Sequence, residues 1–148
     1  MINISKILNE GQVVELSGST RQELLRELTN RVAKLKLLSN PDALYLKLNE
    51  REDESSTAMG LGIAIPHARL STIKETFMIV GRSKEGIDYG APDSGPVHLF
   101  FMMGVSKNQS EYLNILQRIT WIVRNDDLRS KLFDTADIAN VYKLLSEH

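Results

Sequence analysis

The 148 residues of this chain include no cysteine. This absence excludes disulfide bonds, thiolate zinc sites and cysteine nucleophiles from the chain. It also fits a reducing compartment, and we expect a cytoplasmic protein. The N-terminal residues lack the basic start and apolar core of a signal peptide. The longest apolar run, about residues 97–105, is too short to span a bilayer, so we expect no membrane insertion.

The sequence also has no excess of either charge, since 18 basic and 19 acidic residues leave a net charge of −1. Without a basic surplus to bind a phosphate backbone, we expect no nucleic-acid partner. The three histidines are too scattered for metal-ligand spacing, and no Walker loop or nucleophile elbow is present. Gly60-x-Gly62 lacks the third glycine of a dinucleotide fingerprint. The sequence therefore predicts neither a cofactor nor a metal.

What the sequence does contain is a series of alternating helical and strand patterns, in a chain long enough for one domain with a sizeable core. Periodicity predicts strands at about residues 12–16, 56–59, 63–66, 76–82 and 97–104. It predicts helices at about residues 20–35, 40–53, 112–123 and 126–133, and a last helix after Thr135. Residues 84–95 are rich in turn formers. The pattern predicts an α/β fold, a mixed β-sheet flanked by helices, with residues 1–148 as a single domain.

Capping residues indicate where these helices begin. Thr20 with Glu23 forms a capping box, and Asn40 precedes a proline at the first helical position. Asp126 and Thr135 are the expected caps of the last two helices.

Residues 60–69, Gly-Leu-Gly-Ile-Ala-Ile-Pro-His-Ala-Arg, are the most informative segment. The glycines predict a tight turn, and the apolar residues predict a short buried strand. Pro66 should end that strand with a fixed φ, so that His67 leaves the sheet in a defined direction. An imidazole placed in this way can be a nucleophile or a general base, whereas a lone histidine can equally be structural. We interpret His98 and His148 as structural or solvated.

Arg51 lies on the same helical face as Leu44 and Leu48, and an inward guanidinium needs an anion. One interpretation is a pair with Glu52 or Glu54, or a side chain whose head reaches water. The other is a planar donor for a phosphoryl group. The acidic run around Arg51 is itself expected to be a solvated helix end rather than a pair of catalytic carboxylates.

A longer pattern connects these residues. Glu52, then Met59-Gly60, then Ile63-Ala64-Ile65-Pro66-His67-Ala68 resembles the phosphorylation-site signature of the bacterial phosphotransferase system (PTS). Specifically, it is similar to enzyme IIA domains of the fructose, mannitol and nitrogen-regulatory class, type 2. The resemblance covers essentially the whole chain, with residues 84–90 and 96–99 similar to the family's loop and following strand. It implies a mixed sheet flanked by helices, which agrees with the periodicity.

The resemblance also implies a set of roles. His67 would be the phosphoacceptor, taking a phosphoryl group from the phosphocarrier HPr or its nitrogen-branch counterpart. It would pass the group to a cysteine of an enzyme IIB, or hold it as a signal toward a regulatory protein target. Arg51 would stabilise the phosphoryl group, and Thr57 would donate a hydrogen bond to it.

The sequence departs from the family at one position. Many members carry a second active-site histidine early in the helix that follows the last strand. Here that region contains Tyr112 and Asn114, and the gap placement decides which of them takes the position. Either could hydrogen-bond a phosphoryl oxygen or the imidazole, but neither titrates like histidine. Replacing this histidine should affect the rate of phosphoryl transfer, its pH dependence and the choice of acceptor.

Two classes of function follow. The first is a phosphohistidine carrier, most similar to a free-standing nitrogen-regulatory IIA protein, with a sugar-specific IIA component as the alternative. The second is a regulatory module that keeps the fold and binds proteins without turnover. For docking, we expect a shallow apolar surface around residues 60–69, with Leu61 or Ile63 exposed beside His67. Arg69 is either a solvated charge or a docking contact.

Overall fold

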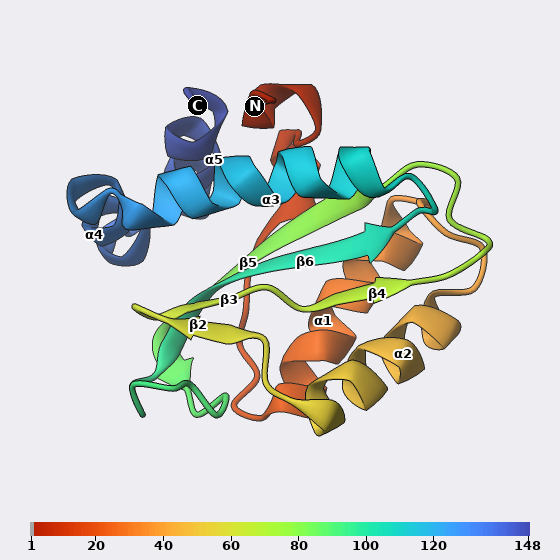
Figure 1. The fold of residues 1–148 in the computed structure, drawn as a ribbon. Coiled ribbons are helices and arrows are strands. Elements are labelled where there is room, and N and C mark those ends of the chain that lie inside the picture. Colours follow the sequence, from red (N-terminus) through yellow and green to blue (C-terminus); the bar gives the residue numbers. More distant parts are fainter. Residues whose placement is uncertain (1) are drawn as a thin grey trace.

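The computed structural model describes residues 2–148 and shows a six-stranded mixed sheet between two layers of helices (Figure 1). The strands are β1 (Val13–Glu15), β2 (Ala58–Gly60), β3 (Ile63–Ala64), β4 (His67–Arg69), β5 (Phe77–Ile87) and β6 (Val97–Val105). The helices are α1 (Arg21–Lys34), α2 (Pro41–Glu54), α3 (Gln109–Arg124), α4 (Asp126–Asp134) and α5 (Ile138–Ser146). Two 3-10 helices, η1 (Ile4–Lys6) and η2 (Glu10–Gln12), precede β1. The predicted α/β fold class is confirmed.

The sheet is built around the antiparallel pair β5–β6, in the order β1-β5-β6-β3-β2. β1 runs parallel to β5, while β3 and β4 both run parallel to β6. β2 closes the edge as the antiparallel partner of β3. The strand β6 therefore touches the whole segment that runs from the glycine turn to Arg69.

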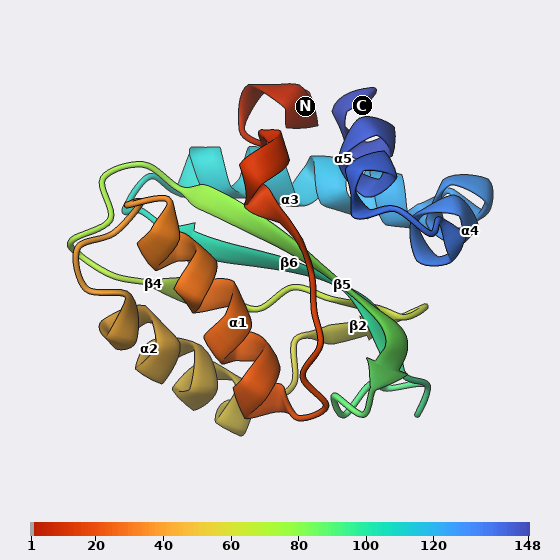
Figure 2. The ribbon, with the colours of Figure 1, turned by 180° about the vertical axis from the view of Figure 1, so that it is seen from behind.

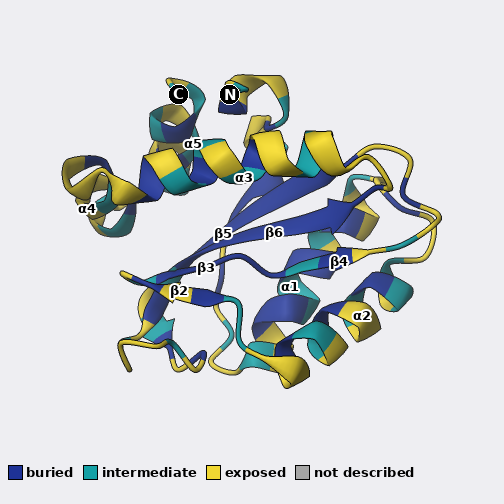
Figure 3. Cartoon of the chain, viewed as in Figure 1, coloured by how far each residue is buried: buried dark blue, intermediate teal, exposed yellow. Residues whose placement is uncertain are grey.

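Successive side chains of the central strands enter two separate apolar cores, because a strand points alternate residues to opposite faces. Phe77 and Ile79 of β5 join the core under α1 and α2. Met78 and Val80 join the core under α3, α4 and α5. Figure 3 shows both central strands buried along most of their length, while the outer faces of the helices are exposed. Burial on both faces explains why these strands have continuous apolar sequences.

The helices divide between the two faces of the sheet. α1 and α2 cover one face, and α3, α4 and α5 cover the other, as the views from opposite sides show (Figures 1 and 2). The two ends of the chain lie on the α3 side, where η1 packs against α5. Within residues 2–148, the helices are too short or too polar to cross a membrane.

The predicted helix starts are confirmed for the first two helices. The Thr20 side chain accepts a hydrogen bond from the Glu23 backbone N–H, and the Asn40 side chain accepts one from Ala43. In a capping box the Glu23 carboxylate would accept a hydrogen bond from the N–H of the N-cap residue, Thr20. Here it accepts from the N–H of the preceding residue, Ser19.

The two later cap predictions are wrong. Asn125 caps α4 by accepting from the Leu128 N–H, and Asp126 is already the first helical residue. Asp137 caps α5, while Thr135 serves as the C-cap of α4. Each region offers several adjacent residues that can cap a helix, so composition alone does not select the one at which the helix begins.

The strand predictions missed the true extent of β5 and the existence of β4. β5 continues to Ile87, into the region expected to be a turn-rich connection, by means of a register shift after Arg82. The shift absorbs the extra residues as a bulge, which allows polar residues to lie within a strand. The two strands beside the glycine turn are also shorter than expected, since β2 begins only at Ala58 and β3 ends at Ala64.

Candidate functional site

His67 is the first residue of β4 and lies opposite Met103 of β6. We expected Pro66 to end the strand and direct His67 out of the sheet, and this is wrong. Proline cannot donate a hydrogen bond, but its carbonyl still accepts one from Met103 N–H at 2.9 Å. Pairing with β6 therefore resumes at once, and a buried Pro66 and Ala68 hold the half-buried His67 between them.

The tautomer of the neutral His67 ring follows from its one backbone contact. Nδ1 lies 2.8 Å from the carbonyl oxygen of Ile65. A carbonyl oxygen can only accept, so Nδ1 carries the hydrogen and donates it. In the neutral ring, Nε2 is then the nitrogen with the free electron pair. The fold thus determines which nitrogen of the neutral His67 ring has a free electron pair.

Tyr112, in the first turns of α3, lies beside this imidazole. The two ring centroids are 5.7 Å apart, with the ring planes inclined by 36°. Asn108 caps the helix by accepting from the Glu111 N–H, which sets the start of α3 and so the place of Tyr112. Asn114 lies two residues further along and is exposed. Of the two candidates for the second position, the structure brings Tyr112 to His67.

The Tyr112 hydroxyl remains protonated at neutral pH. Partial burial raises the pKa of Tyr112 above its ordinary value, against the opposing effect of Arg51 and Arg69, which lower it. The two guanidiniums are therefore near enough to act on the phenol. Residues 67 and 69 are alternate positions of β4, so their side chains lie on the same face of the strand.

Arg51, in the last turn of α2, takes neither of the carboxylate partners that we considered. Its Nη1 donates to the carbonyl oxygen of Ser55 at 2.8 Å. In the described chain, neither Glu52 nor Glu54 forms a salt bridge with it. Since its partner is a neutral carbonyl, the positive charge of Arg51 can still act on an anion bound near Tyr112.

Thr57 has a different partner from the expected phosphoryl group. Its Oγ1 donates to Glu52 Oε2 at 2.8 Å, and its backbone N–H donates to Glu52 Oε1 at 2.7 Å. A hydroxyl has one hydrogen, so Thr57 has none left to offer a phosphoryl oxygen in this arrangement.

Glu52 was expected in a solvated helix end, and this is wrong, since only 5% of the residue is exposed. It also accepts a hydrogen bond from the Tyr89 hydroxyl. Burial, followed by the nearby Glu52, raises the pKa of Tyr89. The sequence does contain a signal for this burial, because Glu52 follows the buried Leu48 by four residues on α2.

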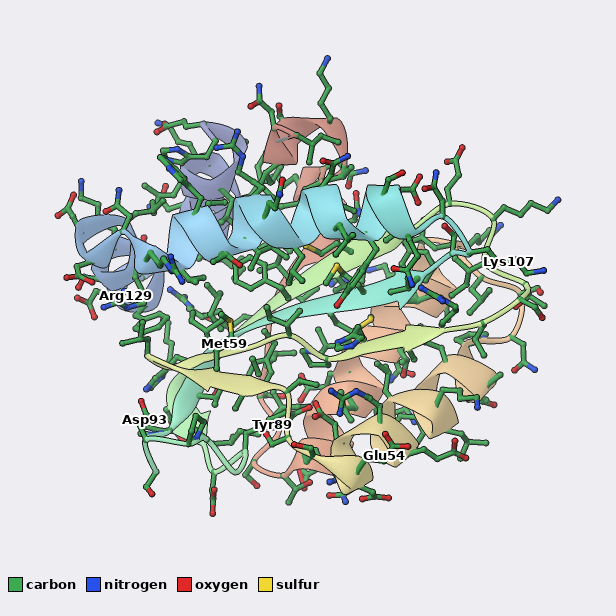
Figure 4. The ribbon with its side chains drawn as sticks, in the orientation of Figure 1. Glu54, Met59, Tyr89, Asp93, Lys107 and Arg129 are labelled. Carbon is green, nitrogen blue, oxygen red and sulfur yellow. The ribbon has the colours of Figure 1, made fainter. Side chains whose placement is uncertain are left out.

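The predicted glycine turn joins β2 to β3 beside the histidine strand. Gly60, Leu61 and Gly62 have positive φ values of 88°, 60° and 78°. Asp93, on the loop before β6, accepts from the Leu61 N–H at 3.0 Å (Figure 4). The hydrogen bond from the Gly95 backbone N–H, followed by this one from Leu61, lowers the pKa of Asp93. The carboxylate therefore remains ionised and holds the turn in place.

The surface around this turn is apolar in part. Leu61 is 53% exposed, as expected, and Met59 of β2 is also exposed. Ile63 is fully buried, because it faces the core under α3. The exposed Arg69 and half-buried Arg51 add positive charge near Tyr112.

A neutral nucleophile, two cations and a phenol donor suit attack on an electrophile that carries negative oxygens. Phosphoryl transfer fits this description, since it depends chiefly on positioning and on charge stabilisation. Residues 6–148 match the protein family described as "Phosphoenolpyruvate-dependent sugar phosphotransferase system, EIIA 2". The chain belongs to this family.

The EIIA 2 relatives include both sugar-specific and regulatory proteins. The chain is 31% identical over 135 residues to the fructose-specific EIIA component of Haloferax volcanii, covering 90% of this chain and 88% of that protein. It is 29% identical over 147 residues to a nitrogen regulatory protein of Pseudomonas aeruginosa, covering 98% and 96%. It also matches the fructose-specific EIIABC component of Bacillus subtilis at 26% identity over 149 residues, 99% of this chain, but spans only 24% of that protein.

The same fold occurs in a solved EIIA structure. The crystal structure of the nitrogen regulatory protein IIA-Ntr from Neisseria meningitidis superposes with a TM-score of 0.85 at 27% identity. The match covers 96% of this chain and 98% of that one. The resemblance to nitrogen-regulatory IIA proteins is thereby confirmed, and the sheet flanked by helices is that of PTS IIA proteins.

Proposed function

We propose that this chain is a phosphohistidine carrier of the phosphotransferase system, with His67 Nε2 as the phosphoacceptor. The observation that carries the proposal is the bond from Nδ1–H to the Ile65 carbonyl, which makes Nε2 the nitrogen with the free electron pair when the ring is neutral. Arg51 and Arg69 supply positive charge next to it, as their effect on the Tyr112 pKa indicates. Membership of the EIIA 2 family supports the same reaction class.

The proposed step exchanges one nitrogen–phosphorus bond for another. The Nε2 electron pair attacks the phosphorus of a donor phosphohistidine, and the bond from phosphorus to the donor nitrogen breaks. The donor ring keeps that electron pair, so both imidazoles end neutral apart from the charge of the phosphoryl group. The neutral ring needs no base for this step, because it keeps its hydrogen on Nδ1 and attacks with the free electron pair of Nε2.

In this proposal the surrounding residues stabilise the transferring oxygens. Arg51 offers its guanidinium, and Arg69 adds a second positive charge from the same strand as His67. The Tyr112 hydroxyl donates a hydrogen bond, taking the place that a second histidine has in many members. Asn114, being exposed, has no such role, and Thr57 acts indirectly through Glu52.

The proposed partners are proteins that carry phosphoryl groups. HPr or its nitrogen-branch counterpart would be the donor, and an enzyme IIB cysteine or a regulatory protein would receive the group or the signal. Residues 1–148 would work as one IIA unit in the cytoplasm. Similarity to a nitrogen regulatory protein along 96% of its length favours the regulatory branch, and the fructose-specific relative keeps the sugar-specific branch as the alternative.

A second candidate function is regulatory binding without turnover. The observation that favours it is Tyr112 beside His67, at a position where many members of the family carry an imidazole. The two candidates differ in whether His67 takes up and discharges a phosphoryl group.

Intact-mass analysis after incubation with phosphoenolpyruvate, enzyme I and HPr tests the proposal. We expect the wild type to gain one acid-labile phosphoryl group, and His67→Ala to gain none. His148→Ala is the matched control, because it removes another imidazole at the end of the chain and should be phosphorylated normally. A wild type that gains no mass with either HPr or its nitrogen-branch counterpart would favour the binding module.

A further inference from the structure

Glu52 is the one carboxylate that is buried within residues 2–148, and the proposed reaction does not use it directly. Its hydrogen-bond donors are all neutral: the Thr57 backbone N–H, the Thr57 hydroxyl and the Tyr89 hydroxyl. A buried carboxylate is costly unless its oxygens are satisfied, and three donors satisfy these. A costly group of this kind needs a role in the molecule.

The Glu52 bonds hold the short linker between α2 and β2. Thr57 is fixed at both its N–H and its hydroxyl, and the neighbouring Ser56 hydroxyl donates to the Tyr89 carbonyl. Tyr89 thus holds the linker from two sides, through its own hydroxyl on Glu52 and through its backbone. Figure 4 shows Tyr89 beside the end of α2 that carries Glu54.

The same linker holds the guanidinium of Arg51. The carbonyl oxygen of Ser55 accepts from Arg51 Nη1 at 2.8 Å, and Ser55 directly precedes the two residues that the Glu52 network holds. A long side chain with a guanidinium at its end keeps one orientation only if its partner is itself fixed. We propose that Glu52 is a positioning residue, which fixes the Ser55–Thr57 linker and thereby holds the Arg51 guanidinium toward His67.

This inference rests on the proposed function, because it concerns the same transfer. A cation already in place when the phosphoryl group arrives stabilises the transition state without reorganising. A misplaced cation lowers the transfer rate even where the fold is intact. The two effects can be separated, because a positioning role requires Arg51 and a purely structural role does not.

The test is a double-mutant cycle on the rate of His67 phosphorylation by phospho-HPr. Glu52→Gln keeps the shape of the side chain but leaves one of its two oxygens, and we expect a rate about 10-fold lower than wild type. In an Arg51→Ala background, the same substitution should change the rate by less than about 2-fold. Glu54→Gln is the matched control, since it removes an exposed carboxylate of the same turn and should leave the rate unchanged.

Each other outcome overturns the inference. A normal rate for Glu52→Gln, or an equal loss with and without Arg51, shows that Glu52 does not act through Arg51. If Glu52→Gln unfolds, as circular dichroism would reveal, the cycle is run with Tyr89→Phe, which removes one donor and keeps the carboxylate. A wild type that takes up no phosphoryl group refutes the proposed function as well, whereas a phosphorylated wild type with additive effects refutes the positioning role alone.

Discussion

Tyr112 shows how one residue can adapt the site. An imidazole at this position would change its charge near neutral pH, whereas a phenol does not. Burial raises the pKa of Tyr112, so the hydroxyl keeps its hydrogen throughout the physiological range. The site therefore gains a hydrogen-bond donor whose state is independent of pH in that range.

We predict that Tyr112→Phe lowers the rate of phosphoryl transfer to His67 by about 10-fold, the usual effect of losing one hydrogen bond to a charged group. The rate is measured by quenched-flow sampling of the phosphoprotein. Tyr142→Phe, which removes a hydroxyl on α5, is the control and should react at the wild-type rate. Equal rates for all three proteins would exclude a hydrogen bond from Tyr112 to the phosphoryl group.

The raised pKa has its own test. The folded pKa lies above the unfolded value of about 10, so ionisation is opposed in the folded state. Any stability that depends on the neutral phenol is present below that value and is lost as pH rises through the folded pKa. In a titration of tyrosinate absorbance, the difference between wild type and Tyr112→Phe should appear at higher pH than free tyrosine. A difference at or below the pH of free tyrosine would contradict the burial.

At the scale of elements, the turn between β2 and β3 is fixed from two directions. Gly62 has a positive φ, and a Cβ at this position would lie 2.9 Å from the ring of Phe133 on α4. The turn is held from one side by Asp93 and is packed on the other by Phe133. A change in the turn should therefore move β3 relative to α4.

We predict that Gly62→Ala lowers the free energy of unfolding by about 2 kcal/mol, from the strained backbone and the overpacking together. Denaturant unfolding measures the loss. Gly11→Ala is the matched control, because its Cβ would meet atoms no closer than 3.4 Å and its φ is not in the left-handed region. An equal change in both variants would show that Phe133 does not constrain the turn.

At the scale of the whole molecule, Arg82 links three parts of the fold. Its guanidinium is fully buried in β5, donates to the Glu15 carboxylate on β1, and also donates to the carbonyl oxygens of Leu132 and Thr135. One side chain thus connects the edge strand, the central strand and the end of α4. By contrast, the ion pairs Arg26–Asp42, Lys47–Glu50 and Lys131–Asp127 lie at the surface, where such pairs stabilise a protein little.

We predict that Glu15→Ala destabilises the protein by about 3 kcal/mol, because it leaves the buried guanidinium of Arg82 with neutral partners alone. Thermal and denaturant unfolding both measure this loss. Glu85→Ala removes an exposed carboxylate from β5 and serves as the control, with an expected change within about 0.5 kcal/mol. A similar small change for Glu15→Ala would mean that the pair does not hold the layers together.

The sequence by itself determined several local features of this protein, although it misplaced the caps of the last two helices. The N-caps at Thr20 and Asn40 and the turn at Gly60 depend on residues a few positions apart, and the structure confirms all three. The signature from Glu52 to Ala68 predicted the family for the same reason, since its residues lie in one short segment of the chain. Such features can be predicted from a sequence because residues a few positions apart are close in space in any fold.

The tertiary structure alone decided which distant residues meet. Pairing with Met103 kept His67 in the sheet, where proline chemistry predicted an exit. Burial of Glu52 depended on Tyr89 from another part of the chain, and the choice of Tyr112 over Asn114 depended on how α3 lies on the sheet. These outcomes follow from long-range pairing and packing, which periodicity along one segment does not encode.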